Sequence, residues 1–252
     1  MLNHIAHKIQ QIRGDLLEKK QHRSIFIANP KLAEVYAIFK NSPEGEWIIG
    51  KNDAAKLYGL LQTYAPQNIL ELGGGIGASA AIMAIAAPGG KITSIEQFEK
   101  CIDIAKKLTP PDILKNINFS YSEAHAFKND LISPYQFFSG YKTLPIQDSP
   151  FDFVIIDGPG YWLENNQLVK LPNGDIINLL PRLAAGCKIY IDGRKQAVGI
   201  YKRFLRPYLS LIKENKQYAL FERTSTRLLD IGEIKIEDAE LAMRRATTPY
   251  FD

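Results

Sequence analysis

The chain has 252 residues, of which 46% are hydrophobic and 23% are charged, so it is long enough to bury a core without metal ions or disulfides. Its 31 Lys and Arg exceed its 27 Asp and Glu only slightly and are scattered, which argues against a nucleic-acid-binding protein. The sequence contains no signal-peptide pattern and no apolar run of about 18 residues, so we expect a cytoplasmic protein without membrane contact.

Helical patterns come first in the chain. Apolar residues between positions 2 and 16 recur three and four positions apart, which predicts a helix that packs on its own domain or docks a partner. Asn29 and Pro30 resemble an N-cap followed by the first residue of a second helix. A third helix is expected from near Asp53 to Pro66.

From residue 67 onward, short apolar runs alternate with helical patterns, which predicts a parallel sheet covered on both faces. The expected strands are Ile69–Leu72, Ile92–Ile95, Ile117–Tyr121, Phe151–Ile156 and Ile189–Ile191. The expected helices are Ala78–Ala87, Phe98–Leu108, Ile176–Leu183 and Gln196–Leu205. We therefore expect a helical extension at residues 1–66, packed on an α/β domain at residues 67–252.

The pattern changes again after Pro207, where strand-like segments follow one another without a helix between them. These segments are Leu209–Lys213, Tyr218–Glu222 and Arg227–Ile231, before a last short helix at Asp238–Arg245. They indicate an antiparallel edge. The fold class predicted is therefore α/β, with a doubly wound, mostly parallel, seven-stranded sheet and additional N-terminal helices.

The segment ELGGGIGAS, from Glu71 to Ser79, follows a strand and opens a helix. Gly73 and Gly75 allow a sharp turn and a close ligand, and N–H groups at the helix start can hold an anionic group. Glu96 ends the next strand, so it is expected beside this turn at the carboxyl edge of the sheet, where ligands usually bind. A carboxylate there can accept hydrogen bonds from the ribose of any nucleoside cofactor.

The same glycines, with Ala78, also satisfy the dinucleotide pattern G-x-G-x-x-G/A, so an NAD(P)-dependent oxidoreductase is an alternative. Three features argue against it. Glu71 would repel a pyrophosphate but suits a cationic ligand group. Asp157 places a further acid at the end of the fourth strand, and the antiparallel edge replaces a second mononucleotide-binding half.

Four segments together carry a family resemblance: ILELGGGIGAS, KITSIE, FDFVIIDG and KIYIDG. They resemble the class I S-adenosylmethionine-dependent methyltransferases, and most closely the small-molecule O-methyltransferase branch related to catechol and caffeoyl-CoA enzymes. The resemblance covers roughly Asp53 to Ile231. It implies a Rossmann-like methyltransferase fold and methyl transfer from S-adenosylmethionine to a small-molecule acceptor, at oxygen. A non-catalytic binding subunit of the same fold is a further alternative.

The resemblance also implies roles for individual residues. Backbone around the two glycines would contact the methionine part of the cofactor, Ser79 its carboxylate and Glu96 its ribose. Residues 122–123 match the place where adenine is held, although Glu123 also fits a solvated loop acid. The cofactor-binding residues expected in this way are Glu71, Gly73, Gly75, Ser79, Glu96, Ser122 and Glu123.

Methyl transfer from a sulfonium requires alignment of the acceptor and often removal of its proton. Asp157 is the expected catalytic residue, as a base or as a group that orients the acceptor. In the metal-dependent relatives an acid at this position binds a divalent cation, with a second acid and an Asn after the fifth strand. Here Asp192 supplies the second acid, but Gly193 replaces the Asn. Metal use therefore stays open, and we expect transfer to survive chelation at least in part.

Other residues have two interpretations each. The stretch from Gly158 to Gly174 is expected to be a long loop, in which Tyr161 and Trp162 stack on an acceptor or anchor the loop. His125 is a base or incidental, and the basic pair at 194–195 contacts an acidic substrate or starts a solvated helix. The two cysteines are expected to be reduced and buried. The acceptor is not identified by the sequence, and a homodimer is the candidate assembly.

Overall fold

The computed structural model describes residues 24–129, 133–144, 149–159, 162–164, 167–169 and 171–226. The helix expected at residues 2–16, the strand expected at Arg227–Ile231, the helix expected at Asp238–Arg245 and the side chains of Tyr161 and Trp162 lie outside this description. Among the residues that are described, every helix is too short or too polar to cross a membrane.

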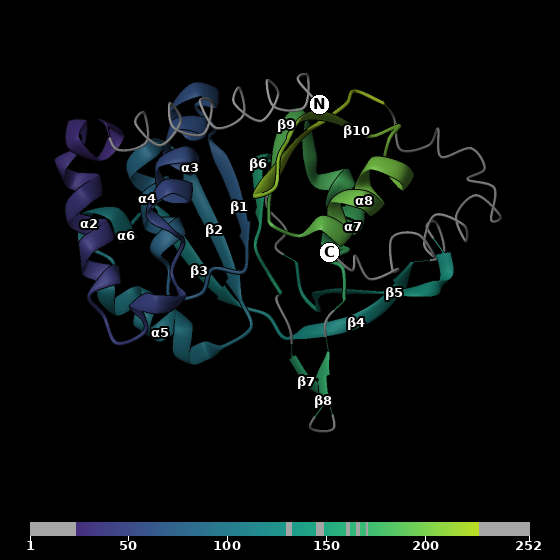
Figure 1. Cartoon of the computed structure of the whole chain (residues 1–252), viewed down its shortest axis with the longest axis horizontal. Helices are drawn as coiled ribbons and strands as arrows, with labels where there is room; N and C mark the ends of the chain where they lie inside the picture. The colour runs from purple at the N-terminus through teal and green to yellow at the C-terminus, as the bar shows by residue number, and fades with distance from the viewer. Residues whose placement is uncertain are drawn as a thin grey trace, which may run out of the picture.

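The described chain is built around a seven-stranded sheet with the order β10-β11-β9-β6-β1-β2-β3 (Figure 1). The strands are β1 Asn68–Leu72, β2 Lys91–Glu96, β3 Ile117–Tyr121, β6 Phe151–Ile156, β9 Leu183–Asp192, β10 Leu209–Glu214 and β11 Tyr218–Arg223. The pairs from β3 to β9 are parallel, whereas β11 is antiparallel to both of its neighbours. The predicted parallel sheet with an antiparallel edge is therefore confirmed.

Helices cover both faces of this sheet, as expected for a doubly wound fold. They are α2 Pro30–Lys40, α3 Lys51–Tyr64, α4 Ala78–Ala86, α5 Glu99–Leu108, α6 Pro111–Leu114, α7 Asp175–Leu179 and α8 Lys195–Phe204, with short 3-10 turns at Gly45–Trp47 and Leu180–Arg182. One hydrophobic cluster joins the sheet to α2, α3, α4 and α5, and another joins its opposite face to α7 and α8. The two clusters make a three-layer structure.

The helix after the glycine turn, α4, lies deepest, as its apolar sequence predicts. The helices α2 and α3 pack against it from the N-terminal side, with Val35, Leu57 and Leu61 fully buried in the shared cluster. Asn29 stands at the N-cap of α2, but its side chain accepts a 2.9 Å hydrogen bond from the Tyr58 hydroxyl instead of capping the helix. The N-terminal helices thus support the layer that carries the glycine turn.

Two expectations for the second half of the chain are wrong. The helix predicted at Ile176–Leu183 is α-helical only to Leu179 and continues as a 3-10 turn at Leu180–Arg182, because Pro181 has no N–H to donate to an α-helical hydrogen bond. The loop predicted after Asp157 contains a two-stranded hairpin of β7 Trp162–Glu164 and β8 Gln167–Val169. A second unpredicted hairpin, β4 Ala124–Asn129 with β5 Ser133–Tyr141, lies between β3 and β6 in the chain.

Candidate functional site

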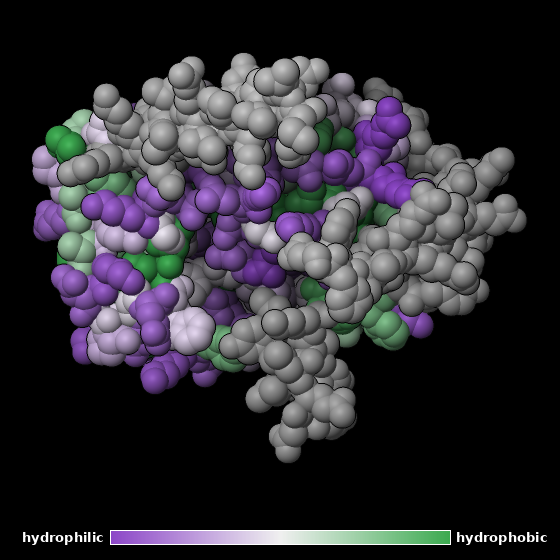
Figure 2. Space-filling view, in the orientation of Figure 1, coloured by the Kyte–Doolittle hydropathy of each residue, from purple (hydrophilic) through white to green (hydrophobic). Residues whose placement is uncertain are grey.

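Four acidic residues lie at the carboxyl edge of the sheet. Three of them belong to strand ends: Glu71 to β1, Glu96 to β2 and Asp192 to β9. The fourth, Asp157, directly follows β6. These four strands are consecutive parallel neighbours in the sheet. The chain leaves β1 toward β2 and later returns to β6 on its other side, so the strand order reverses between β1 and β6. Ligands of open α/β sheets bind at such a reversal. Figure 2 shows hydrophilic side chains in the hollowed middle of this face, between α5 and β4.

Glu71 is the buried member of this group, with only 1% of its surface exposed. Its Oε2 accepts a 2.5 Å hydrogen bond from the Ser94 hydroxyl. Its buried Oε1 has no donor with hydrogen-bond geometry among the described residues, although the Ser79 hydroxyl lies close enough to the carboxyl group to lower its pKa. Burial raises the pKa of Glu71 to about 7, while the nearby hydroxyls of Ser79 and Ser94 lower it and Asp157 and Glu96 raise it. A buried acceptor without a donor is costly, so Oε1 suits a cationic donor on a ligand.

The glycines of the turn have different tasks. Gly73 has φ 95°, and a side chain there would overlap the backbone of Gly158, so this glycine lets the ends of β1 and β6 approach each other. Gly75 has φ 51°, and a Cβ built on it would meet nothing within 4 Å. Gly75 therefore presents bare backbone to open space, where a ligand can come close.

Glu96 is bound to the glycine turn directly. Its Oε2 accepts a 2.8 Å hydrogen bond from the Gly75 N–H, and its Oε1 accepts bonds of 2.7 and 3.1 Å from the N–H groups of Gln97 and Phe98. Burial raises the pKa of Glu96, and these three bonds lower it. Because a carboxylate offers about four acceptor positions, one remains for a ligand hydroxyl. The predicted position of Glu96 is confirmed, and its role stays a prediction.

The residues after β3 are held by neighbouring protein groups. The buried Ser122 hydroxyl accepts a 2.9 Å hydrogen bond from the N–H of Thr143. Glu123 has 59% of its side chain exposed and forms a 2.7 Å ion pair with Lys142, which agrees with a solvated loop acid. His125 stacks on Phe127 with ring centroids 5.5 Å apart. The adenine-binding role of residues 122–123 stays a prediction.

Asp157 directly follows β6 and donates its backbone N–H to the carbonyl oxygen of Leu72, at 2.8 Å. Its side chain remains 53% exposed, although the protein atoms around it raise the pKa of its carboxyl above the usual range. Arg194 lowers this pKa, and Asp192 and Glu96 raise it. Asp157 is thus accessible to a substrate while it lies among other charges.

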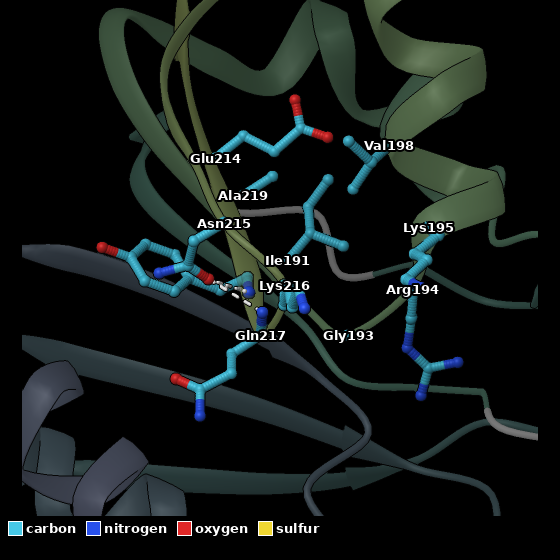
Figure 3. A pocket seen from close by; sticks show the side chains of 11 residues that line it. Ile191, Gly193, Arg194, Lys195, Val198, Glu214, Asn215, Lys216, Gln217 and Ala219 are labelled. Carbon is cyan, nitrogen blue, oxygen red and sulfur yellow. Dashed lines mark hydrogen bonds between the residues drawn. The ribbon is translucent and has the colours of Figure 1, made fainter. Parts of the chain in front are cut away.

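Arg194 is the cation that contacts Asp157. Its Nη2 lies 3.3 Å from Oδ1 of Asp157 and donates to the carbonyl oxygen of the same residue, and its Nη1 donates to the carbonyl oxygen of Pro159 at 3.4 Å. In Figure 3 the Arg194 side chain extends from the start of α8 away from Val198 and Ile191, and these three residues line the same open pocket. The two basic residues at 194–195 therefore have different surroundings, because Arg194 contacts Asp157 whereas Lys195 is exposed.

Asp192 ends β9 close to the start of α3. Burial raises its pKa, as does Asp53, whereas Arg194 and Lys56 lower it. The Lys56 ammonium lies 3.0 Å from Oδ1 of Asp53 and also donates to Gln217 at 3.0 Å. The part of the chain that the structure describes contains no group of three His, Cys, Asp or Glu side chains arranged to hold a metal ion.

Tyr141 is a site residue that the sequence analysis missed. It ends β5 with 3% of its surface exposed, and its hydroxyl has no hydrogen-bond partner among the described residues. The hydroxyl lies against Gly158, because a Cβ built on that glycine would be 2.8 Å from it. Glu96, Arg194 and Glu71 all influence its pKa, which burial raises well above the usual value. The aromatic-rich segment Ser133–Tyr141 is the signal that predicts a strand here.

A buried polar network fixes Tyr141 against Gly158. Asn173 donates from Nδ2 to the Gly158 carbonyl oxygen at 2.8 Å and to Oδ2 of Asp175 at 2.9 Å. Oδ1 of Asp175 accepts the Tyr141 N–H at 2.9 Å, and the Tyr201 hydroxyl donates to the Asn173 carbonyl oxygen at 2.8 Å. The end of β5 is therefore linked to the segments that follow β6 and β8.

No protein-family model matches the sequence, and no curated protein matches it significantly. Solved structures do match. A Staphylococcus aureus protein assigned to the caffeoyl-CoA O-methyltransferases is 17% identical, with a TM-score of 0.55 over 82% of this chain and 99% of that one. A Klebsiella pneumoniae protein assigned to the O-methyltransferases is 15% identical, with a TM-score of 0.53 over 83% and 100%. A Podospora anserina methyltransferase bound to S-adenosylhomocysteine is 13% identical, with a TM-score of 0.50 over 77% and 88%.

The chain has the class I methyltransferase fold. Within this fold, the structure brings together Glu71, Gly73, Gly75, Glu96 and Asp157, as the sequence predicts. Ser79 lies in the first turn of α4 beside Glu71, and Ser122 donates its N–H to the Glu96 carbonyl oxygen at 3.0 Å. The positions of these residues agree with a methyltransferase site, and their ligand contacts stay predictions.

Proposed function

We propose that the chain transfers a methyl group from S-adenosylmethionine to an oxygen atom of a small-molecule acceptor. The observation that carries this proposal is Oε1 of Glu71, a buried acceptor without a donor beside an open glycine turn. The cofactor's ammonium group fits this oxygen, and its ribose hydroxyls fit the free acceptor position of Glu96. The bare backbone of Gly75 leaves room for the methionine part.

The charge of the edge supports this cofactor over a nicotinamide dinucleotide. Four carboxylates, those of Glu71, Glu96, Asp157 and Asp192, lie at the ends of consecutive strands. Arg194 lowers the pKa of Asp157 and of Asp192, and Lys56 lowers that of Asp192. A pyrophosphate placed at the glycine turn would add negative charge next to carboxylates and would be repelled. A sulfonium cofactor with an ammonium group would instead be attracted.

When bound, the cofactor supplies an electrophilic methyl group. The chain must then align the acceptor oxygen and, where it is protonated, take up its proton. Asp157 is suited to both tasks, because its carboxylate is half exposed at the edge and forms an ion pair with Arg194. Its raised pKa moves it toward the range in which a carboxylate accepts a proton effectively. The Tyr141 hydroxyl lies against Gly158, next to the adjacent ends of β1 and β6, and can donate to a ligand there.

Calorimetry with S-adenosylhomocysteine and with NAD tests the cofactor. We expect binding of the first without comparable binding of NAD, and Glu96→Gln should weaken it by about 1–3 kcal/mol, the usual range for a hydrogen bond to a charged group. Glu99→Gln is the matched control, because Glu99 is exposed three residues further on. Tight NAD binding without a response to S-adenosylhomocysteine would overturn the proposal.

Asp157→Asn separates an enzyme from a non-catalytic binding subunit. We expect the variant to keep its affinity for S-adenosylhomocysteine and to lose turnover in a screen of acceptors with a labelled methyl donor.

We further propose a cytoplasmic location without a nucleic-acid partner. Free thiols at Cys101 and Cys187 agree with a reducing compartment. The homodimer stays a prediction.

A further inference from the structure

The side chain of Arg194 crosses the edge where the metal-dependent relatives are expected to hold a cation. It starts directly after Gly193, whose φ of 55° turns the chain out of β9. Its guanidinium contacts the carboxylate and carbonyl oxygens of Asp157 and the carbonyl oxygen of Pro159. Only 23% of the side chain is exposed, so the guanidinium is enclosed between the segments after β6 and β9.

The oxygen atoms around this position do not fit a divalent cation. Magnesium requires near-ideal octahedral geometry, and calcium takes six to eight oxygen ligands. Asp157 and Asp192 offer two carboxylates, and Gly193 offers no side chain. Three oxygen atoms of Asp157 and Pro159 that a hard cation would use already accept from Arg194. Metal binding would require the guanidinium to leave.

A guanidinium also performs the electrostatic task of such an ion. Asp157 and Asp192 lie at the ends of the neighbouring parallel strands β6 and β9, where two negative carboxylates repel each other. Arg194 carries a permanent positive charge in a planar group with five N–H donors, and it lies directly beside Asp157. The guanidinium offsets this repulsion and, unlike a bound metal ion, it cannot dissociate from the chain.

We propose that Arg194 takes the place of the divalent cation, so that the cation of the site is part of the chain and the site excludes a metal. The role of Arg194 in catalysis, in place of a metal ion, rests on the proposed function. The exclusion of a metal is a property of the side chains alone, and it is measured without any acceptor or cofactor.

Mn²⁺ is the probe, followed by its paramagnetic resonance signal and by calorimetry. We expect no saturable binding to the wild-type chain at millimolar Mn²⁺. Gly193→Asn combined with Arg194→Ala should gain saturable binding, because the guanidinium is removed and an amide oxygen is added; Asn tolerates the positive φ of residue 193 better than most residues. Lys195→Ala is the control, since it removes the same charge from an exposed neighbour.

Saturable Mn²⁺ binding by the wild type that disappears in Asp157→Asn would overturn the proposal. Absence of binding in a double variant that unfolds cooperatively on heating would overturn it as well, because Arg194 would then not be what excludes the ion. If the double variant does not fold, Arg194→Gln takes its place under the same criteria. Failure to bind S-adenosylhomocysteine would instead contradict the proposed function and would leave the Mn²⁺ results interpretable.

Discussion

The Ser94 hydroxyl donates a 2.5 Å hydrogen bond to Oε2 of Glu71 across the parallel pair β2 and β1. Both side chains are buried, so this bond fixes the carboxyl group in one orientation. Oε1 then has no donor among the described residues. Two neighbouring strands thus prepare a half-satisfied acceptor at the ligand-binding edge of the sheet, and the first two predictions follow from it.

Glu71→Gln should weaken the binding of S-adenosylhomocysteine by about 1.5–3 kcal/mol, because the ligand's ammonium group loses a charged acceptor. Calorimetry at neutral pH measures the change. Glu222→Gln is a suitable control, since Glu222 pairs with Lys188 on β9 and is partly exposed. An unchanged affinity in a folded Glu71→Gln protein would show that the ammonium group binds elsewhere.

The pH dependence of binding and of stability should also follow Glu71, whose pKa is about 7 in the folded chain against 4.5 for a free carboxyl group. A cation binds the ionised form, so affinity for S-adenosylhomocysteine should rise with pH through about 7 and then level off. Stability changes in the opposite direction. The folded state holds the proton more tightly, so the contribution of Glu71 is complete below its unfolded pKa and is lost as the pH rises toward 7.

Chemical unfolding of the wild type and of Glu71→Gln checks this second effect. The variant cannot ionise, so its advantage in unfolding free energy should grow by up to about 3 kcal/mol between pH 4.5 and 7. Taking the difference between the two proteins cancels other titrating groups such as Asp175. A difference that does not vary with pH would contradict the assignment.

The sequence predicts the parallel part of the site well, for a physical reason. In a parallel sheet, all carboxyl ends meet at one edge, so the residues that follow each strand are known to be neighbours once the strands are found. This rule places Glu71, Glu96 and Asp157 beside one another. The glycine pattern further marks the turn, although it does not distinguish the packing role of Gly73 from the open face of Gly75.

The rest of the site depends on contacts that local patterns do not encode. Tyr141 is positioned by the Asp175 carboxylate, 34 residues further along the chain, and Arg194 reaches Asp157 across 37 residues. The aromatic segment before Tyr141 carries a strand signal without a ligand motif. Arg194 follows a strand end in a pattern that predicts only a helix start, and its contact with Asp157 depends on the tertiary fold.

Gly73→Ala should mainly reduce stability, whereas Gly75→Ala should mainly reduce ligand binding. The first adds a side chain that overlaps the Gly158 backbone at a φ of 95°, so we expect a loss of about 2–4 kcal/mol in unfolding free energy. The second adds a methyl group to open space at a φ of 51°, so it should cost about 1–2 kcal/mol of stability and mainly obstruct the ligand. Denaturant titration with calorimetry separates the two, and equal effects on stability would refute the distinction.

Tyr141→Phe tests whether the buried hydroxyl beside Gly158, next to the adjacent ends of β1 and β6, binds a ligand. In the free protein this hydroxyl has no hydrogen-bond partner among the described residues, so its removal should leave stability unchanged or raise it by about 1 kcal/mol. Burial keeps the phenol protonated, because its pKa is raised well above the usual value, and it can therefore act only as a neutral donor or acceptor. We expect affinity for S-adenosylhomocysteine to fall by about 1 kcal/mol, the contribution of one neutral hydrogen bond. Tyr121→Phe is the matched control, since Tyr121 is half exposed at the end of β3. A structural hydroxyl would give the reverse result, with lower stability and unchanged affinity, and that outcome would remove Tyr141 from the site.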